Sequence, residues 1–72
     1  MNNLNVAKIQ LNGVPYKINY GPNLNELLNK LKIQKNKVAV EVNGAIIEKN
    51  KYTNFVLNKD DKVEIVKFIG GG

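Results

Sequence analysis

The sequence GPNLNELLNKL, residues 21–31, predicts the helix around which the rest of this 72-residue chain is arranged. Asn23 stands three residues before Glu26, which is the spacing of a capping box at the start of a helix. The leucines recur at positions i, i+3, i+4 and i+7: Leu24, Leu27, Leu28 and Leu31. This stripe is typical of a helix that buries one face against a sheet. We therefore expect a helix over residues 24–31 whose leucines lie in the core and bind no ligand.

An antiparallel hairpin is predicted before the helix. Residues 4–11 and residues 14–20 both alternate apolar and polar side chains, and Asn12-Gly13 lies between them. Asn-Gly favours a type I′ turn, because both central residues of that turn need positive φ angles. Pro15 has no backbone N–H, so we expect it at a sheet edge or at the start of its strand.

The residues after the helix predict three more strand segments. Residues 38–42 alternate Val with Ala and Glu, and Asn43-Gly44 makes a second tight turn before a short segment, residues 45–47. Residues 55–57 return an apolar cluster to the core, and residues 62–69 form the last strand.

The connections in this half of the chain are polar. Residues 48–54 are polar apart from Tyr52 and are predicted to be a loop that crosses the end of the sheet. Residues 58–61 turn the chain into the last strand and include the neighbouring carboxylates Asp60 and Asp61. Adjacent positions in a turn, without the spacing of an EF-hand loop, favour a solvated pair over a calcium site.

The order of these segments predicts a single α+β domain over residues 1–69. Two hairpin strands are joined by a helical crossover to residues 38–42, which we expect to pair beside the first strand. The result is a mixed sheet of four to five strands curled around one helix, a β-grasp arrangement. Residues 70–72 are predicted to be a flexible glycine tail outside this domain.

The composition excludes several kinds of catalysis. The chain contains no Cys, Ser or His, so it has no ordinary nucleophile with an imidazole base and no nitrogen or sulfur ligand for zinc. The sequence has no apolar run long enough to span a membrane and no secretion signal at Met1-Asn2-Asn3. We expect a soluble intracellular protein with no membrane partner.

The net charge of +5 raises the question of a nucleic-acid partner. All eleven basic residues are lysines, and none is the arginine best suited to recognising phosphate and guanine through two parallel hydrogen bonds. The lysines are also spread from Lys8 to Lys67. We therefore predict no nucleic-acid partner and attribute the lysine content to a low-GC genome, since Lys, Asn and Ile share A/T-rich codons.

The end of the chain carries the candidate reactive group, the carboxylate of Gly72. Gly70, Gly71 and Gly72 have no side chains, so they can pass through a channel too narrow for other residues. Fully extended, three residues reach roughly 10 Å. This pattern favours delivery of the terminus into the active site of another protein, and the alternative is a frayed terminus.

A glycine tail cannot dock a partner alone, because fixing three glycines costs on the order of 3–6 kcal/mol with few side-chain contacts to offset it. The outward face of the last strand supplies Val66 and Phe68, with Ile69 at the base of the tail. These three residues are the predicted partner-docking surface, since exposed apolar patches on small domains mark partner sites. The alternative is that Phe68 simply packs over the sheet edge.

The sequence DKVEIVKFIGGG, residues 61–72, resembles the C-terminus of the ThiS family, the sulfur carrier proteins of thiamine biosynthesis within the ubiquitin-like β-grasp group. The shared features are an acidic residue, a strand written Glu-Ile-Val and a terminal Gly-Gly. Further similar features cover nearly the whole chain: Leu27-Leu28, Val42-Asn43-Gly44, Ile46-Ile47 and Tyr52. The family commonly has glycine where this chain has Asp60, so we expect a slightly different turn there.

The resemblance implies a mechanism in which this chain is a protein cosubstrate and not an enzyme. A ThiF-like activating enzyme uses ATP and Mg²⁺ to adenylate the carboxylate of Gly72, and a sulfur donor such as a cysteine desulfurase displaces AMP to leave a thiocarboxylate. A ThiG-like thiazole synthase then takes the sulfur into the thiazole ring of thiamine. The carrier itself would bind no cofactor or metal and would be monomeric when free. It would work in the cytoplasm, or in the plastid stroma if it is organelle-encoded.

Three other functions stay open from the sequence. The small subunit of molybdopterin synthase shares the fold and the Gly-Gly end, but usually has prolines shortly before the glycines, and residues 64–69 contain none. A ubiquitin-like modifier would join Gly72 to lysine side chains. A non-covalent ubiquitin-like interaction or RNA-binding module would be indifferent to the loss of Gly71-Gly72 and would bind with a steep salt dependence.

Overall fold

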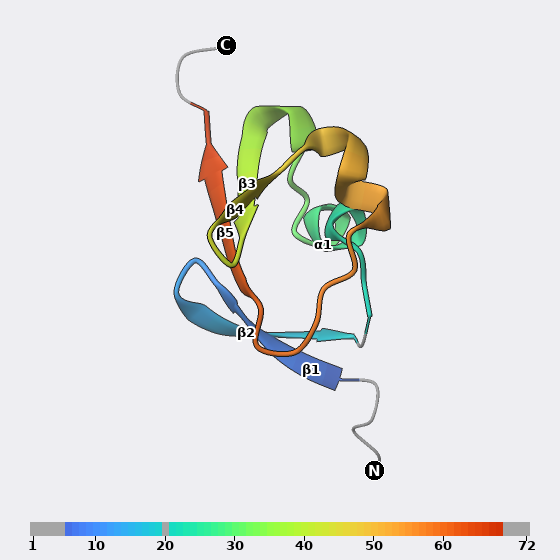
Figure 1. The fold of residues 1–72 in the computed structure, drawn as a ribbon, viewed down its shortest axis with the longest axis vertical. Coiled ribbons are helices and arrows are strands. Elements are labelled where there is room, and N and C mark those ends of the chain that lie inside the picture. Colours follow the sequence, from blue (N-terminus) through green and yellow to red (C-terminus); the bar gives the residue numbers. More distant parts are fainter. Residues whose placement is uncertain (1–5, 20, 69–72) are drawn as a thin grey trace.

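The computed structural model describes residues 6–19 and 21–68 and shows one mixed sheet that packs around a single α-helix (Figure 1). The strands are β1 (Val6–Leu11), β2 (Val14–Asn19), β3 (Val38–Val42), β4 (Ala45–Ile47) and β5 (Lys62–Lys67). The helices are α1 (Leu24–Lys30) and the 3₁₀-helices η1 (Lys35–Lys37) and η2 (Lys49–Asn54). The predicted α+β class and β-grasp arrangement are confirmed. Several predictions concern residues outside the described ones: the strand positions of Leu4, Asn5, Tyr20 and Ile69, and the tail, residues 70–72.

The last strand of the chain lies at the centre of the sheet. The strand order is β2-β1-β5-β3-β4, with β5 parallel to β1 and antiparallel to β3. The expectation that residues 38–42 pair beside the first strand is therefore wrong, because β5 occupies that place. The crossover through α1 places β3 two positions away from β1 in the sheet. The last strand of the chain, β5, fills the position between them.

Both Asn-Gly turns have the predicted backbone conformation. Asn12 and Gly13 have φ angles of 50° and 81°, and Asn43 and Gly44 have φ angles of 54° and 86°. These positive values at both central residues are those of type I′ turns, which match the twist of antiparallel strands. Strand β2 lies at the sheet edge, so Pro15 interrupts no ladder on its outer side, as predicted.

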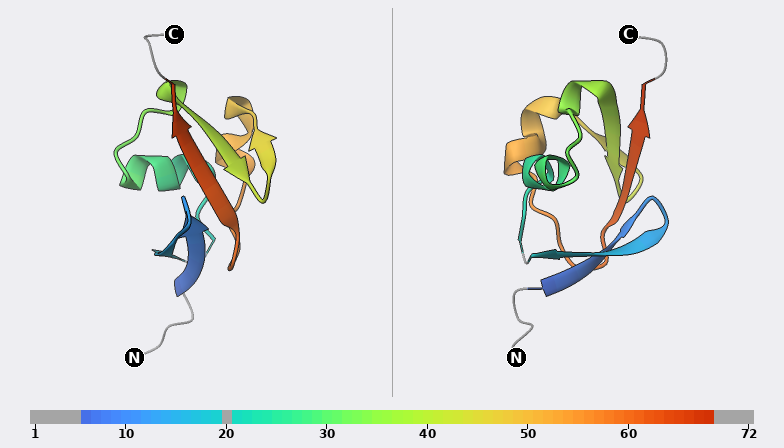
Figure 2. Two further views of the ribbon diagram at one scale, coloured as in Figure 1. Left: turned by 90° about the vertical axis from the view of Figure 1, so that its left-hand side faces the viewer. Right: turned by 180° about the vertical axis from the view of Figure 1, so that it is seen from behind.

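Helix α1 begins with the predicted capping box. The backbone N–H of Glu26 donates to Oδ1 of Asn23 at 2.8 Å, and the backbone N–H of Asn23 donates to Oε1 of Glu26 at 2.9 Å. Leu24, Leu27 and Leu28 are buried against the sheet, and Leu31 caps the helix end half-buried. The rest of the core comes from alternate strand residues and from two residues of the C-terminal half: Ala7, Ile9, Ile18, Val38, Val40, Val42, Val63, Tyr52 and Leu57. Figure 2 shows α1 and η2 on the same side of the sheet.

The segment predicted as a loop, residues 48–54, contains the 3₁₀-helix η2, so that prediction is wrong. Tyr52 is only 1% exposed and anchors this helix over the core. Residues 55–57 then pair with the start of α1: the N–H of Leu24 donates to the carbonyl of Phe55 at 3.0 Å, and the N–H of Leu57 donates to that of Pro22 at 2.8 Å. This extended pairing buries Leu57 and turns Val56 outward, so only part of the predicted apolar cluster reaches the core.

No helix in the described part of the chain is long and apolar enough to cross a membrane.

Candidate functional site

The first half of β5 is held from the β1 side by a side chain that takes the place of a strand residue. Strand β1 pairs with β5 at only two positions, Gln10 with Lys62 and Leu11 with Val63. The carboxamide of Asn12 then continues the ladder: the N–H of Ile65 donates to Oδ1 of Asn12 at 2.7 Å, and Nδ2 of Asn12 donates to the carbonyl of Ile65 at 3.2 Å. Asn12 can do this because asparagine tolerates the left-handed turn conformation and carries an amide like that of the backbone.

The start of β5 is held by the second Asn-Gly turn. The N–H of Lys62 donates to Oδ1 of Asn43 at 2.9 Å, and the N–H of Asn43 donates to the carbonyl of Lys62 at 2.7 Å. Nδ2 of Asn43 also donates to Oδ1 of Asp61 at 3.0 Å, while Oδ2 of Asp61 accepts from the N–H of Asn58 at 2.8 Å. Both turns therefore fix the strand that leads to the glycine tail.

The sequence predicted that Asp60 and Asp61 are a solvated pair, and this holds for Asp60 but is wrong for Asp61. Asp60 is exposed, but Asp61 is half-buried and its two oxygens bind the turn. Asp60 has a φ angle of 69°, the left-handed conformation that glycine adopts most easily, so it keeps a glycine-like backbone. Within residues 6–19 and 21–68, no three His, Cys, Asp or Glu side chains lie close enough together to hold a metal ion.

The second half of β5 is paired differently and presents the predicted docking residues. Val66 pairs only with Ala39 of β3 and is 56% exposed, on the face of the sheet opposite α1. Phe68 follows the strand and donates its N–H to the carbonyl of Lys37 at 3.0 Å. Its ring is 53% exposed, with Nζ of Lys49 at 5.3 Å from the ring centroid. Phe68 therefore contacts a lysine and still offers half of its surface; the docking role of Val66, Phe68 and Ile69 stays a prediction.

Ile69, Gly70, Gly71 and Gly72 lie outside the described residues and follow Phe68 directly in the chain. The structure thus brings together Val66 and Phe68 of the predicted site and describes the base from which the tail continues. The reactive role of Gly72 and the passage of Gly70, Gly71 and Gly72 into a partner stay predictions.

The structure adds one exposed apolar residue on the same face of the sheet that the predicted docking surface does not include. Ile46 of β4 is 71% exposed and pairs with Glu41 of β3, which pairs with Glu64 of β5. Residues that pair directly point to the same face, so this row lies on the same outer face as Val66. The Asn43-Gly44 turn contains the signal that could have found it, because a two-residue turn fixes the register of the strands on both sides.

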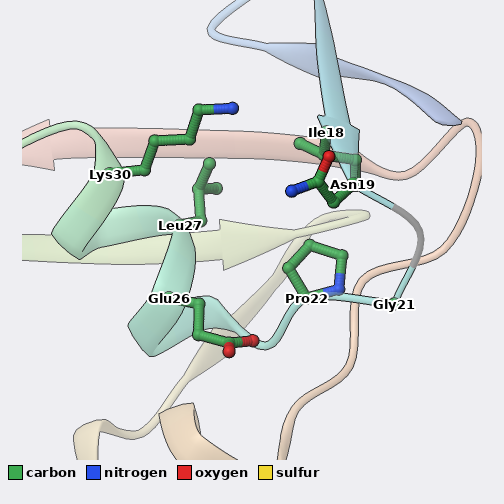
Figure 3. Close-up of a pocket in the computed structure, with 7 residues that line it drawn as sticks. All are labelled: Ile18, Asn19, Gly21, Pro22, Glu26, Leu27 and Lys30. Atoms are coloured by element: carbon green, nitrogen blue, oxygen red, sulfur yellow. The ribbon is translucent and has the colours of Figure 1, made fainter. Parts of the chain in front are cut away.

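A cavity of about 320 Å³ lies on the other side of the sheet, between the end of β2 and α1 (Figure 3). Its polar side chains already have structural roles. Glu26 is held in the capping box, and Nζ of Lys30 lies 5.7 Å from the centroid of the Tyr16 ring. The remaining lining is Ile18, Asn19, Gly21, Pro22 and Leu27. This cavity has no group poised for catalysis, whereas Val66 and Phe68, at and after the end of β5, present an exposed apolar surface shortly before the tail in the chain.

A small mixed sheet around one helix, with its central strand leading into a glycine end, defines the ubiquitin-like β-grasp class of protein. The model of the family described as ThiS family matches residues 9–72, which includes the whole of β5 and the tail. The crystal structure of thiamine biosynthesis protein ThiS from Geobacter metallireducens has a TM-score of 0.80 and 34% identity, covering 90% of this chain and 99% of that chain. The chain belongs to the ThiS family.

Two curated relatives differ in how much of them the chain covers. The uncharacterized protein ycf40 from Porphyra purpurea is 35% identical over 72 residues, which is 100% of each chain. The thiazole synthase from Magnetococcus marinus is 46% identical over 65 residues, which is 90% of this chain but 20% of that protein. The chain therefore spans about a fifth of the length of that thiazole synthase.

Proposed function

We propose that this chain is a sulfur carrier protein of thiamine biosynthesis that carries sulfur as a thiocarboxylate on Gly72. The observation that carries the proposal is the match to the ThiS family through residue 72, which includes the glycine end. The structure of β5 supports it, because side chains of both Asn-Gly turns hold the first half of the strand while Val66 and Phe68, which follow it, are exposed.

The chemistry requires partner enzymes. A carboxylate is a poor electrophile, so its oxygen first attacks the α-phosphorus of ATP and releases pyrophosphate. The terminal sulfur of a donor persulfide then attacks the acyl carbon, and AMP leaves with the bonding electron pair. A thiol attacks the donor sulfur of the resulting acyl disulfide, so the S–S bond breaks, a new disulfide forms on the donor and the thiocarboxylate leaves with the electron pair. This chain has no Cys, Ser or His to perform these steps, so ATP, Mg²⁺ and the catalytic groups belong to a ThiF-like enzyme. A cysteine desulfurase is the proposed source of sulfur.

The proposed acceptor is a ThiG-like thiazole synthase. A protein named thiazole synthase contains a region 46% identical to this chain as 20% of its own length. Joining a carrier to the enzyme that consumes its sulfur would raise the effective concentration of each for the other. The chain itself is proposed to be a cosubstrate in the cytoplasm, or in the plastid stroma if it is organelle-encoded.

The test is the intact mass of the protein after incubation with MgATP, a ThiF-like enzyme, a sulfur-loaded cysteine desulfurase and a thiol reductant. We expect replacement of one oxygen by sulfur, and no change in a variant that lacks residues 70–72. Adding a thiazole synthase with its other substrates should return the mass to that of the carboxylate. An unchanged mass, with the activating enzyme competent on its own carrier, would contradict the proposal.

A further inference from the structure

A pocket of about 260 Å³ with an unusual charge lies where β5 ends. Three lysines line it, Lys32, Lys37 and Lys67, together with the apolar Ile33, Val38 and Phe68. None of the six acidic residues of the chain is among the residues that line it. Three lysines and no carboxylate among the lining residues give this pocket a positive charge, so it favours an anionic occupant.

The lysines come from separate elements that meet at the end of the strand. Lys37 ends η1 and accepts the N–H of Phe68 on its carbonyl at 3.0 Å. Lys67 ends β5 and pairs with Val38, so its side chain stands on the pocket side of the sheet. Lys32 follows α1, where the N–H of Lys32 donates to the carbonyl of Asn29 at 3.1 Å. The pocket therefore lies at the junction that holds Phe68, the last described residue before the tail.

Lys32 occupies a backbone position at the end of α1 that glycine usually takes. The N–H of Ile33 donates to the carbonyl of Leu28 at 2.9 Å, which completes a Schellman motif with Lys32 at its left-handed position. Lys32 has a φ angle of 60° there, although glycine is the usual residue because it has no Cβ to strain. The turn does not require a lysine, and the lysine at this position adds to the positive charge of the pocket.

We propose that this lysine pocket binds an acidic segment of the activating enzyme, an inference that rests on the proposed function. Residue 68 lies four positions before Gly72, so an extended tail places the reacting carboxylate within about 14 Å of the pocket. An enzyme that adenylates Gly72 therefore brings its surface close to the pocket. Carboxylates of that enzyme would neutralise the lysines, speed the encounter and fix the orientation in which the tail enters.

The features of the pocket favour a protein partner over a nucleic acid. Lysine offers a point charge, and the chain has no arginine for two-pronged contacts with phosphate or guanine. Phe68 is the aromatic side chain of the pocket, and the ammonium of Lys49 already lies 5.3 Å from its ring centroid. That ring is partly occupied and is a poor platform for a stacked base.

The test compares two variants with the same change of net charge. The pocket variant combines Lys32→Gln, Lys37→Gln and Lys67→Gln, and the control combines Lys8→Gln, Lys17→Gln and Lys59→Gln in β1, β2 and the turn before β5. We measure ATP–pyrophosphate exchange by a ThiF-like enzyme against carrier concentration. The pocket variant should raise KM about tenfold at low salt with kcat unchanged, and the control should change KM less than about twofold. The three single pocket variants, each about twofold in KM, give the same answer if the triple variant fails to fold.

Each result has one meaning. If the wild-type chain supports exchange but both triple variants behave alike, the inference is wrong and the proposed function stands. If the wild-type chain supports no exchange with a competent enzyme, the proposed function fails. Loss of single-stranded RNA binding in the pocket variant, with KM unchanged, would overturn the protein partner in favour of a nucleic acid.

Discussion

Val63 and Val66 lie three residues apart in β5, yet Val63 is 0% exposed and Val66 is 56% exposed. Val63 is paired on both sides, with Leu11 of β1 and with Val42 of β3. The pairing on the β1 side ends at Ile65, where the Asn12 carboxamide closes the ladder. The two halves of β5 therefore have different roles. The first half holds the sheet together, and the second half leads to the exposed residues that precede the tail.

The largest effect is expected from Val63→Asp. The substitution places a carboxylate without a partner at the centre of the sheet, which costs several kcal/mol in real proteins. A domain of this size has little stability in reserve. We expect no cooperative thermal transition by circular dichroism at neutral pH. A transition close to that of the wild type would show that the first half of β5 is not part of the core.

Asn12→Gly should cost about 1–3 kcal/mol of the free energy of unfolding. Glycine keeps the positive φ angle of the turn but removes both hydrogen bonds to Ile65, each of which contributes roughly 0.5–1.5 kcal/mol. Asn12→Asp is the control: its oxygen still accepts from the N–H of Ile65, but it has no donor for the carbonyl. The free energy of unfolding in urea should fall from the wild type to Asn12→Asp and then to Asn12→Gly. An Asn12→Gly variant as stable as the wild type would mean that the backbone pairing with β1 and β3 holds β5 without the Asn12 side chain.

The burial of Tyr52 makes the stability of the fold depend on pH. Burial raises the pKa of Tyr52 above its ordinary value of 10.0. The folded chain then keeps a proton that the unfolded chain releases, so this contribution is intact below pH 10 and stability falls as the pH rises above it. The slope from this group is at most about 1.4 kcal/mol per pH unit. Tyr52→Phe should unfold with a shallower decline above pH 10, and an identical decline would show that Tyr52 does not carry it.

The local features of this fold could be predicted from the sequence because each rests on a few neighbouring residues. The positive φ angles of Asn12 and Asn43 follow from Asn-Gly, and the capping box follows from the spacing of Asn23 and Glu26. The strand order could not be predicted, since the position of β5 between β1 and β3 depends on contacts between residues far apart in the chain. Residues 48–54 have no clear period, so nothing in them indicated η2.

Some features of the candidate site could also be predicted from the sequence, and others could not. The exposure of Val66 and Phe68 followed from strand alternation alone. The position of Ile46 required the register across β4, β3 and β5, and the lysine pocket required the meeting of α1, η1 and β5. The lysines look scattered in the sequence, and only the folded chain shows that three of them surround one pocket.

Val66→Asp should have the smallest effect on stability and a clear effect on function. The side chain is 56% exposed, so we expect the free energy of unfolding to change by less than about 0.5 kcal/mol. If the proposed docking surface is correct, an aspartate beside Phe68 should raise the KM of the carrier for a ThiF-like enzyme while leaving kcat unchanged. Val14→Asp is the matched control, since Val14 is 62% exposed at the start of β2, and β2 is not the strand that leads to the tail. Equal KM values for the two variants would remove Val66 from the docking surface, and unfolding of Val66→Asp would mean that both halves of β5 belong to the core.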